Sequence, residues 1–172
     1  MLPRTNIYSR LWSILRPLHS LLMNYYTTST FRQSVAVLTK KSKDGYSTVV
    51  SDICKALQDM PDNIARDTNE RIKMFDEYRI VKLRVPNSGL RLAKANGFRL
   101  IYWVSMRHDN LVLLRVYPKR GPKGVTDIVD EEYDRLLMEL AQESQAHSIH
   151  QVDIANSLVE LSETISLGQN HQ

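Results

Sequence analysis

The sequence contains only one cysteine, Cys54, in 172 residues. A single thiol cannot form an internal disulfide, and no Cys/His group has the spacing of a zinc site. Six glycines and six prolines are too few for a collagen-like or low-complexity chain. No run approaches the roughly 18 to 20 uninterrupted apolar residues of a membrane span. We therefore expect a cytoplasmic protein that is held together by its own core, with no cofactor, metal or membrane contact.

Acidic residues are missing from the start of the chain, because none precedes Asp44. Residues 1–22 combine arginine and serine with a moderately apolar stretch, a composition similar to that of an organellar transit peptide. A simpler interpretation is that Met23 is the true start, since it leads directly into the first regular element. We favour Met23 and treat residues 1–22 as an N-terminal extension.

Charge is distributed in blocks. Residues 71–124 contain thirteen Lys/Arg and three acidic residues, a net charge of +10. Residues 125–172 contain ten acidic residues and one arginine, a net charge of −9. A basic block this dense favours a polyanionic partner such as a nucleic acid. The alternative is a basic surface that is simply solvated.

Residue patterns predict the order of the elements. Aromatic and β-branched runs bounded by turn residues favour strands, which we expect at 25–30, 78–85, 97–104 and 111–117. Apolar residues at helical spacing favour two helices between residues 30 and 60, and a third that starts at residue 127 or 130. Near the C-terminus, a coiled-coil-like stripe consists of Ile154, Leu158, Leu161 and Ile165.

This order predicts an α+β fold, in which a small antiparallel sheet of about four strands packs against two N-terminal helices. A folded domain is expected at 23–140, followed by an acidic helical tail at 141–172. The apolar stripe is expected to dock this tail or to support self-association. Four acids are expected to lie near the basic block and partly screen it: Asp130, Glu131, Glu132 and Asp134. The alternative is that these acids only keep a solvated helix soluble.

Several basic residues lie in or directly after the predicted strands: Lys82, Arg84, Arg99, Lys119 and Arg120. Lys82 and Arg84 point the same way, because side chains two apart in a strand share a face. If the strands are neighbours, their cations converge on one side, where they repel one another unless an anion lies between them. Arginine binds phosphate through two parallel hydrogen bonds, and an aromatic ring such as Tyr102 can stack on a base. The alternative is that each cation pairs with an acid of this chain.

Three stretches resemble the RelE/ParE superfamily of bacterial type II toxins: Lys82-Leu83-Arg84, Gly97-Phe98-Arg99-Leu100-Ile101-Tyr102 and Leu113-Leu114-Arg115-Val116-Tyr117-Pro118-Lys119-Arg120. The resemblance covers about residues 25–133 and implies the RelE-like fold. It implies a metal-independent endoribonuclease that cleaves ribosome-bound mRNA and is neutralised by a cognate antitoxin protein. ParE-type members of the superfamily inhibit DNA gyrase instead. A non-catalytic nucleic-acid-binding or regulatory module on the same fold is a third hypothesis.

The resemblance assigns the catalytic roles to Lys82, Arg99 and Arg120. The remaining RNA-binding residues are predicted to be Arg79, Arg84, Tyr102, Lys119 and Lys123. A second lysine of the family falls on Ile80, which is a departure from the pattern.

The C-terminal tyrosine of the family falls near Thr126, so that Tyr117 and Tyr133 are the candidates to replace it. Such a site promotes attack of a ribose 2′-hydroxyl on the adjacent phosphorus. Because neighbouring cations disfavour an ammonium, we hypothesise that Lys82 serves as the general base.

Overall fold

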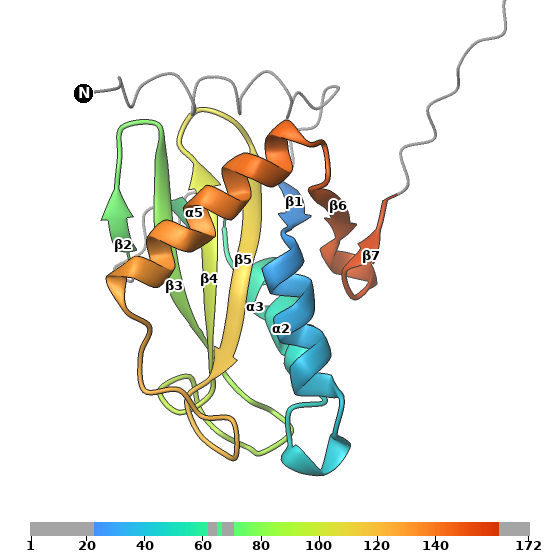
Figure 1. Cartoon of the computed structure of the whole chain (residues 1–172). Coiled ribbons are helices and arrows are strands. Elements are labelled where there is room, and N and C mark those ends of the chain that lie inside the picture. Colours follow the sequence, from blue (N-terminus) through green and yellow to red (C-terminus); the bar gives the residue numbers. More distant parts are fainter. Residues whose placement is uncertain (1–22, 62–64, 67–70, 162–172) are drawn as a thin grey trace, which may run out of the picture.

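The computed structural model describes residues 23–61, 65–66 and 71–161 (Figure 1). In these ranges one mixed sheet has helices on both faces. The elements are β1 (Asn24–Thr27), α2 (Ser29–Thr39), η1 (Ser42–Asp44), α3 (Val49–Gln58), β2 (Arg71–Met74), β3 (Tyr78–Val85), β4 (Phe98–Ser105), β5 (Asn110–Pro118), α5 (Asp130–Gln145), β6 (His150–Asp153), η2 (Ile154–Asn156) and β7 (Val159–Glu160). No helix within the described ranges is long and apolar enough to cross a bilayer.

The sheet has the strand order β2-β3-β4-β5-β1-β6-β7. Strands β2 to β5 form an antiparallel meander, and the predicted hairpin of the third and fourth expected strands is confirmed, because β4 pairs antiparallel with β5. Strand β1 then pairs in parallel with β5. Beyond β1, β6 and β7 continue the sheet in antiparallel pairing.

The prediction of a small four-stranded sheet against two N-terminal helices is wrong. The described residues form a seven-stranded sheet, and α2 and α3 follow β1 rather than opening the fold. Helix α5 starts at Asp130, as predicted for the third helix, and covers the opposite face of the sheet (Figure 1). Residue patterns missed β2, β6 and β7 because these strands have four, four and two residues, too few for a periodicity to be recognised.

The predicted C-terminal helical tail is wrong beyond Gln145: residues 141–145 complete α5, and the elements that follow among the described residues are β6, η2 and β7. Ser157 and Leu158 have φ values of 56° and 61°, in the left-handed region that a right-handed helix excludes. Ile154 and Leu158 pack on the core beside α3, which accounts for part of the apolar stripe. Leu161 is 47% exposed, and Ile165 lies outside the described residues.

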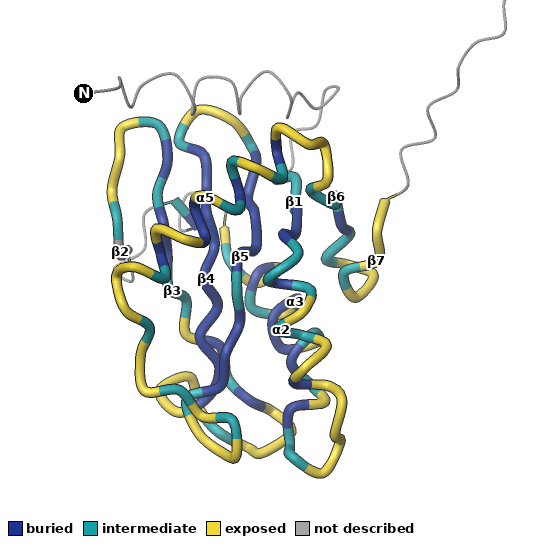
Figure 2. Tube along the Cα trace, viewed as in Figure 1, coloured by how far each residue is buried: buried dark blue, intermediate teal, exposed yellow. Residues whose placement is uncertain are grey.

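Strand β4 separates two apolar layers, and all eight of its residues are buried (Figure 2). Its even-numbered residues from Phe98 to Val104 face the layer of α2 and α3. Ile101 and Trp103 face the other layer, where α5 contributes Tyr133, Leu136, Leu137 and Leu140. Because side chains alternate along a strand, a polar residue of β3 to β5 lies on the side of α5 or on the side of α2 and α3.

Two glutamates of α5 bind the start of α2. Glu143 accepts hydrogen bonds from the Ser29 amide at 3.0 and 3.1 Å, and Glu139 accepts from the Ser29 hydroxyl at 2.7 Å and the Thr30 amide at 3.0 Å. These bonds satisfy amides that a helix leaves unpaired, next to the positive end of its dipole. Partial burial acts to raise the pKa of Glu139, but the hydrogen bonds from Thr30 and Ser29 outweigh it and lower the pKa below its ordinary value.

We expect Glu139→Gln to lower the free energy of unfolding by about 1 kcal/mol at neutral pH, because the neutral amide interacts less well with the helix start. A lowered folded-state pKa stabilises the fold above the unfolded-state pKa, and this contribution is lost as the pH falls through the folded value. Urea unfolding should therefore separate the variant from the parent chain at pH 7 and bring the two together in acid.

The control is Glu131→Gln, at an exposed position in the first turn of α5. It should change the free energy of unfolding by less than about 0.5 kcal/mol. A Glu139→Gln deficit that is equally large in acid would contradict the charged cap.

Candidate functional site

Basic side chains gather on the face of the sheet that α5 partly covers. Lys82 and Arg84 lie on the same side of β3 as Ile80, which packs under α5. Arg84 is directly opposite Arg99 of β4, and Arg99 is opposite Tyr117 of β5. The expected convergence of the strand cations on one face is therefore confirmed for Lys82, Arg84 and Arg99.

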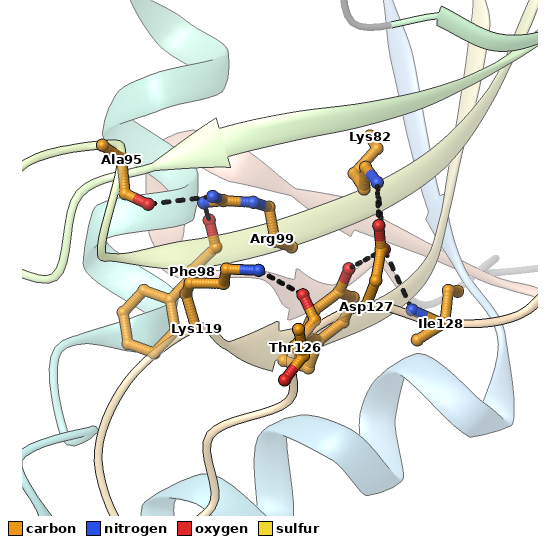
Figure 3. A network of polar contacts seen from close by, with 9 residues as sticks. Lys82, Ala95, Phe98, Arg99, Lys119, Thr126, Asp127 and Ile128 are labelled. Carbon is orange, nitrogen blue, oxygen red and sulfur yellow. Dashed lines mark hydrogen bonds and ion pairs between the residues drawn. The ribbon is translucent and has the colours of Figure 1, made fainter.

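A carboxylate lies among these cations. The Lys82 Nζ atom is 3.0 and 3.1 Å from the two carboxylate oxygens of Asp127, and the Tyr117 hydroxyl donates to Asp127 Oδ1 at 3.3 Å. The Ile128 amide donates to the same oxygen at 2.9 Å. Figure 3 shows Asp127 between Lys82 and Ile128. We call Lys82, Tyr117 and Asp127 the K-Y-D cluster.

The cluster has a defined electrostatic state. Burial raises the pKa of Tyr117, and the neighbouring Asp127 carboxylate raises it further, so this hydroxyl stays protonated at neutral pH. Slight burial acts to raise the pKa of Asp127, but the hydrogen bonds from Lys82, Ile128 and Tyr117 hold it below its ordinary value. The resting cluster thus contains a carboxylate, which forms an ion pair with Lys82, and a neutral phenol.

Tyr133 approaches the cluster from α5. It is 3% exposed, and its hydroxyl finds no hydrogen-bond partner among the residues described. Burial raises its pKa, as do the nearby Tyr117 and Asp127. Of the two tyrosines considered as replacements for the missing family residue, Tyr117 is thus bonded to the cluster and Tyr133 lies close to it.

Arg99 holds the backbone rather than facing solvent. It is 8% exposed, and its guanidinium donates to the carbonyls of Lys94 at 3.0 Å, Ala95 at 2.9 Å and Phe98 at 3.2 Å. Figure 3 shows Arg99 beside Ala95 and Phe98. Gly97 allows this tight bend, since a Cβ atom there would lie 2.1 Å from the Val85 carbonyl oxygen. In the folded chain Arg99 thus fixes the connection between β3 and β4.

That connection presents further cations at the end of the sheet. Asp52 of α3 accepts a hydrogen bond from the Ser88 amide at 3.0 Å, and so holds the connection from its other side. Arg91 and Lys94 are exposed on it, as is Arg120 directly after β5. Arg120 donates to the Asn96 side chain at 3.1 Å. Within the described ranges, none of these three cations forms an ion pair with an acid.

Acids of α5 pair with other cations of the sheet. Glu132 pairs with Arg115 of β5, and Asp134 is 2.8 Å from Lys73 of β2. The expected approach of the acidic segment to the basic face is therefore confirmed for these two acids. Whether they weaken RNA binding stays a prediction.

Three predicted RNA-binding residues are directed elsewhere. Tyr102 is fully buried on the face of α2 and α3 and donates to the Ala65 carbonyl at 2.9 Å, so it offers no ring for stacking. Arg79 lies on that same face and donates to the Arg66 carbonyl at 2.6 Å. Lys123 donates to the Val37 carbonyl at 2.7 Å, toward the end of α2. Arg79 and Lys82 are three positions apart in β3, so the alternation of side chains along a strand places them on opposite faces of the sheet. The prediction grouped them because both are basic and close in sequence.

Lys119 stays near the site, where it donates to the Thr126 carbonyl (Figure 3). Sequence reasoning treated Asp127 only as a helix start and so missed its contact with Lys82. One signal was present: Gly121 and Gly124 follow Pro118, which predicts a chain reversal after β5. The Val125 amide donates to the Pro118 carbonyl at 2.9 Å, and this reversal returns Asp127 to the sheet.

A cavity of about 470 Å³ lies away from the basic face. It is lined mainly by apolar side chains of β1, α3 and the β6–η2 segment, among them Tyr25, Leu57 and Ile154. Asp153 is its one acidic lining residue. Because this cavity lacks a group of titratable side chains, the K-Y-D cluster is the better candidate for chemistry.

We expect Arg99→Ala to lower the free energy of unfolding by about 2 to 3 kcal/mol, because three carbonyl groups lose a charged donor. Arg120→Ala is the matched control, since its side chain is exposed and binds one side-chain amide; it should change stability by less than about 0.5 kcal/mol. Urea unfolding measures both. Equal stability losses would show that the guanidinium of Arg99 is not a structural clamp.

The chain matches no protein-family model, no curated protein and no solved structure. The geometry of the site and the toxin-like stretches described above are therefore the basis for assigning a function.

Proposed function

We propose that this chain is a toxin-type endoribonuclease of the RelE kind, which cleaves ribosome-bound mRNA in the cytoplasm and is neutralised by an antitoxin protein. The observation that carries the proposal is the K-Y-D cluster at a cation-rich end of the sheet. Lys82 Nζ, Asp127 Oδ1 and the Tyr117 hydroxyl are joined by bonds of 3.0 and 3.3 Å. They supply a cation, a proton acceptor and a hydroxyl donor within one small region.

The surroundings of the cluster suit an RNA backbone. Arg84, Arg91, Lys94 and Arg120 are exposed at this end of the molecule, and cations near phosphates release condensed counterions on binding. The Lys82 side chain is 27% exposed and that of Asp127 is 58% exposed. An RNA strand that lies along these cations therefore reaches the cluster from solvent. Cleavage by a ribose 2′-hydroxyl then requires charge stabilisation and proton transfer, both of which side chains can provide.

A second candidate is a non-catalytic RNA-binding module. One observation favours it: Arg99, to which the resemblance assigns catalysis, is bound to three carbonyl groups and is 8% exposed. In this hypothesis the cations bind RNA and no bond is broken. The two candidates predict the same binding and differ in the fate of the mRNA.

The first test is addition of the full chain to a bacterial translation reaction. We expect protein synthesis to stop and mRNA fragments to accumulate, detected by primer extension. Lys82→Gln should slow cleavage by about 100-fold or more, because the neutral amide cannot stabilise the phosphorane. Lys55→Ala removes an exposed cation from α3 and is the control that should cleave at the parental rate.

Each other outcome identifies a different function. Intact mRNA, a normal rate of synthesis and induction of the DNA-damage response in cells would indicate a gyrase inhibitor. RNA binding with intact mRNA would indicate the non-catalytic module.

The second test measures the affinity for a single-stranded RNA at several salt concentrations. Lys94→Ala with Arg120→Ala should weaken binding and reduce the slope of log K against log salt by about 1 to 1.5, because two phosphate contacts are lost. Glu132→Gln should tighten binding, since it releases Arg115 from its carboxylate. If the double variant has the same salt slope as Lys55→Ala, the RNA binds elsewhere on the surface.

A further inference from the structure

The Asp127 carboxylate occupies the solvent side of the K-Y-D cluster. Three donors fix it: the Lys82 ammonium at 3.0 and 3.1 Å, the Ile128 amide at 2.9 Å and the Tyr117 hydroxyl at 3.3 Å. More than half of its side chain is exposed, against about a quarter for Lys82. A nucleotide that reaches Lys82 therefore meets a carboxylate whose position is set before binding.

We propose that Asp127, rather than Lys82, accepts the ribose 2′ proton, and that the Lys82 ammonium stabilises the phosphorane and protonates the leaving oxygen. This inference rests on the proposed RNA cleavage and names the groups that carry it. An ammonium has no lone pair with which to accept a proton, and arginine is never an acceptor. Asp127 is the acceptor that faces solvent in the cluster.

The step balances without any other reactant. Asp127 takes the proton from O2′, the O2′–P bond forms, and the P–O5′ bond breaks as Lys82 gives a proton to O5′. The products carry a 2′,3′-cyclic phosphate and a 5′-hydroxyl, while Asp127 is left protonated and Lys82 neutral. Because these two groups are hydrogen-bonded at 3.0 Å, the proton then passes from Asp127 to Lys82 and restores the starting state.

Lys82 of β3, Tyr117 of β5 and Tyr133 of α5 interact with Asp127 directly. The other charged groups nearby act on these tyrosines, on the adjacent Thr126 or on one another: Arg99 of β4, Arg115 and Lys119 of β5, and Asp130 and Glu132 of α5. The hydrogen bonds described above keep the pKa of Asp127 below its ordinary value, so the acceptor is already deprotonated well below neutrality. Cleavage by this route has a rate that does not rise with pH near neutrality. A lysine base would instead give a rate that rises about tenfold per pH unit.

The test uses the full chain with ribosome-bound mRNA under single-turnover conditions. Asp127→Asn should slow cleavage by about 100-fold or more, while RNA affinity stays equal or increases because a negative charge is removed. Asp127→Glu retains a carboxylate and should cleave at least about tenfold faster than Asp127→Asn. Asp59→Asn, which removes an exposed carboxylate directly after α3, is the control and should match the parent chain.

The outcomes separate this inference from the proposed function. A parent chain that never cleaves RNA overturns both. Cleavage by the parent and by Asp127→Asn at the same rate overturns only the role of Asp127, as does a rate that rises tenfold per pH unit between about pH 6 and 8. If Asp127→Asn unfolds at a lower temperature than the parent chain, the cleavage rate of Asp127→Glu is the test. A folded Asp127→Glu chain that binds RNA but does not cleave it overturns the inference.

Discussion

Burial of strand β4 on both faces is the constraint on which the remaining arrangement depends. All eight of its residues are buried, and a strand of this kind needs an apolar cover on each side. Helices α2 and α3 cover one side and α5 covers the other. The segment after β5 must therefore cross the end of the sheet to bring α5 over the second face, and this crossing carries Asp127 to Lys82.

The same crossing explains why opposite charges meet. The sheet surface next to α5 has cations where the apolar cover ends, and the first turns of α5 are acidic. Glu132 pairs with Arg115 and Asp134 pairs with Lys73, and both pairs reduce the repulsion among the cations. Because these pairs are partly solvated, the free energy of desolvating their charges is moderate. Arg91, Lys94 and Arg120 form no ion pair with an acid among the described residues, and this difference divides the face into a structural part and a part available to a ligand.

Much of the sheet and little of the site could be predicted from the sequence. Both bounds of β3, Tyr78 and Val85, were predicted correctly, because alternating side chains and a following turn mark the ends of this strand. The pairing of β1 with β6 was missed, since it joins residues more than 120 positions apart and β6 has one buried side chain, Val152. At the site, strand alternation placed Lys82 and Arg84 correctly. It carries no information on whether a cation meets a phosphate, a carboxylate or a carbonyl, which is why Asp127 and the carbonyl contacts of Arg99 were missed.

The strand added by the C-terminal segment has a consequence for solubility. β1 pairs with β5 along one edge and with β6 along the other, where β6 meets Tyr25 to Thr27. The backbone amides and carbonyls on this second edge of β1 are therefore hydrogen-bonded by β6. A chain cut after α5 would expose this row as a ready template for a second copy. Dimers or fibres joined strand to strand would then form, although every side chain of the basic face is intact. In the full chain the strand at this edge of the sheet is β7, which has only two residues. So short a strand offers too few unpaired backbone groups to pair with a second copy.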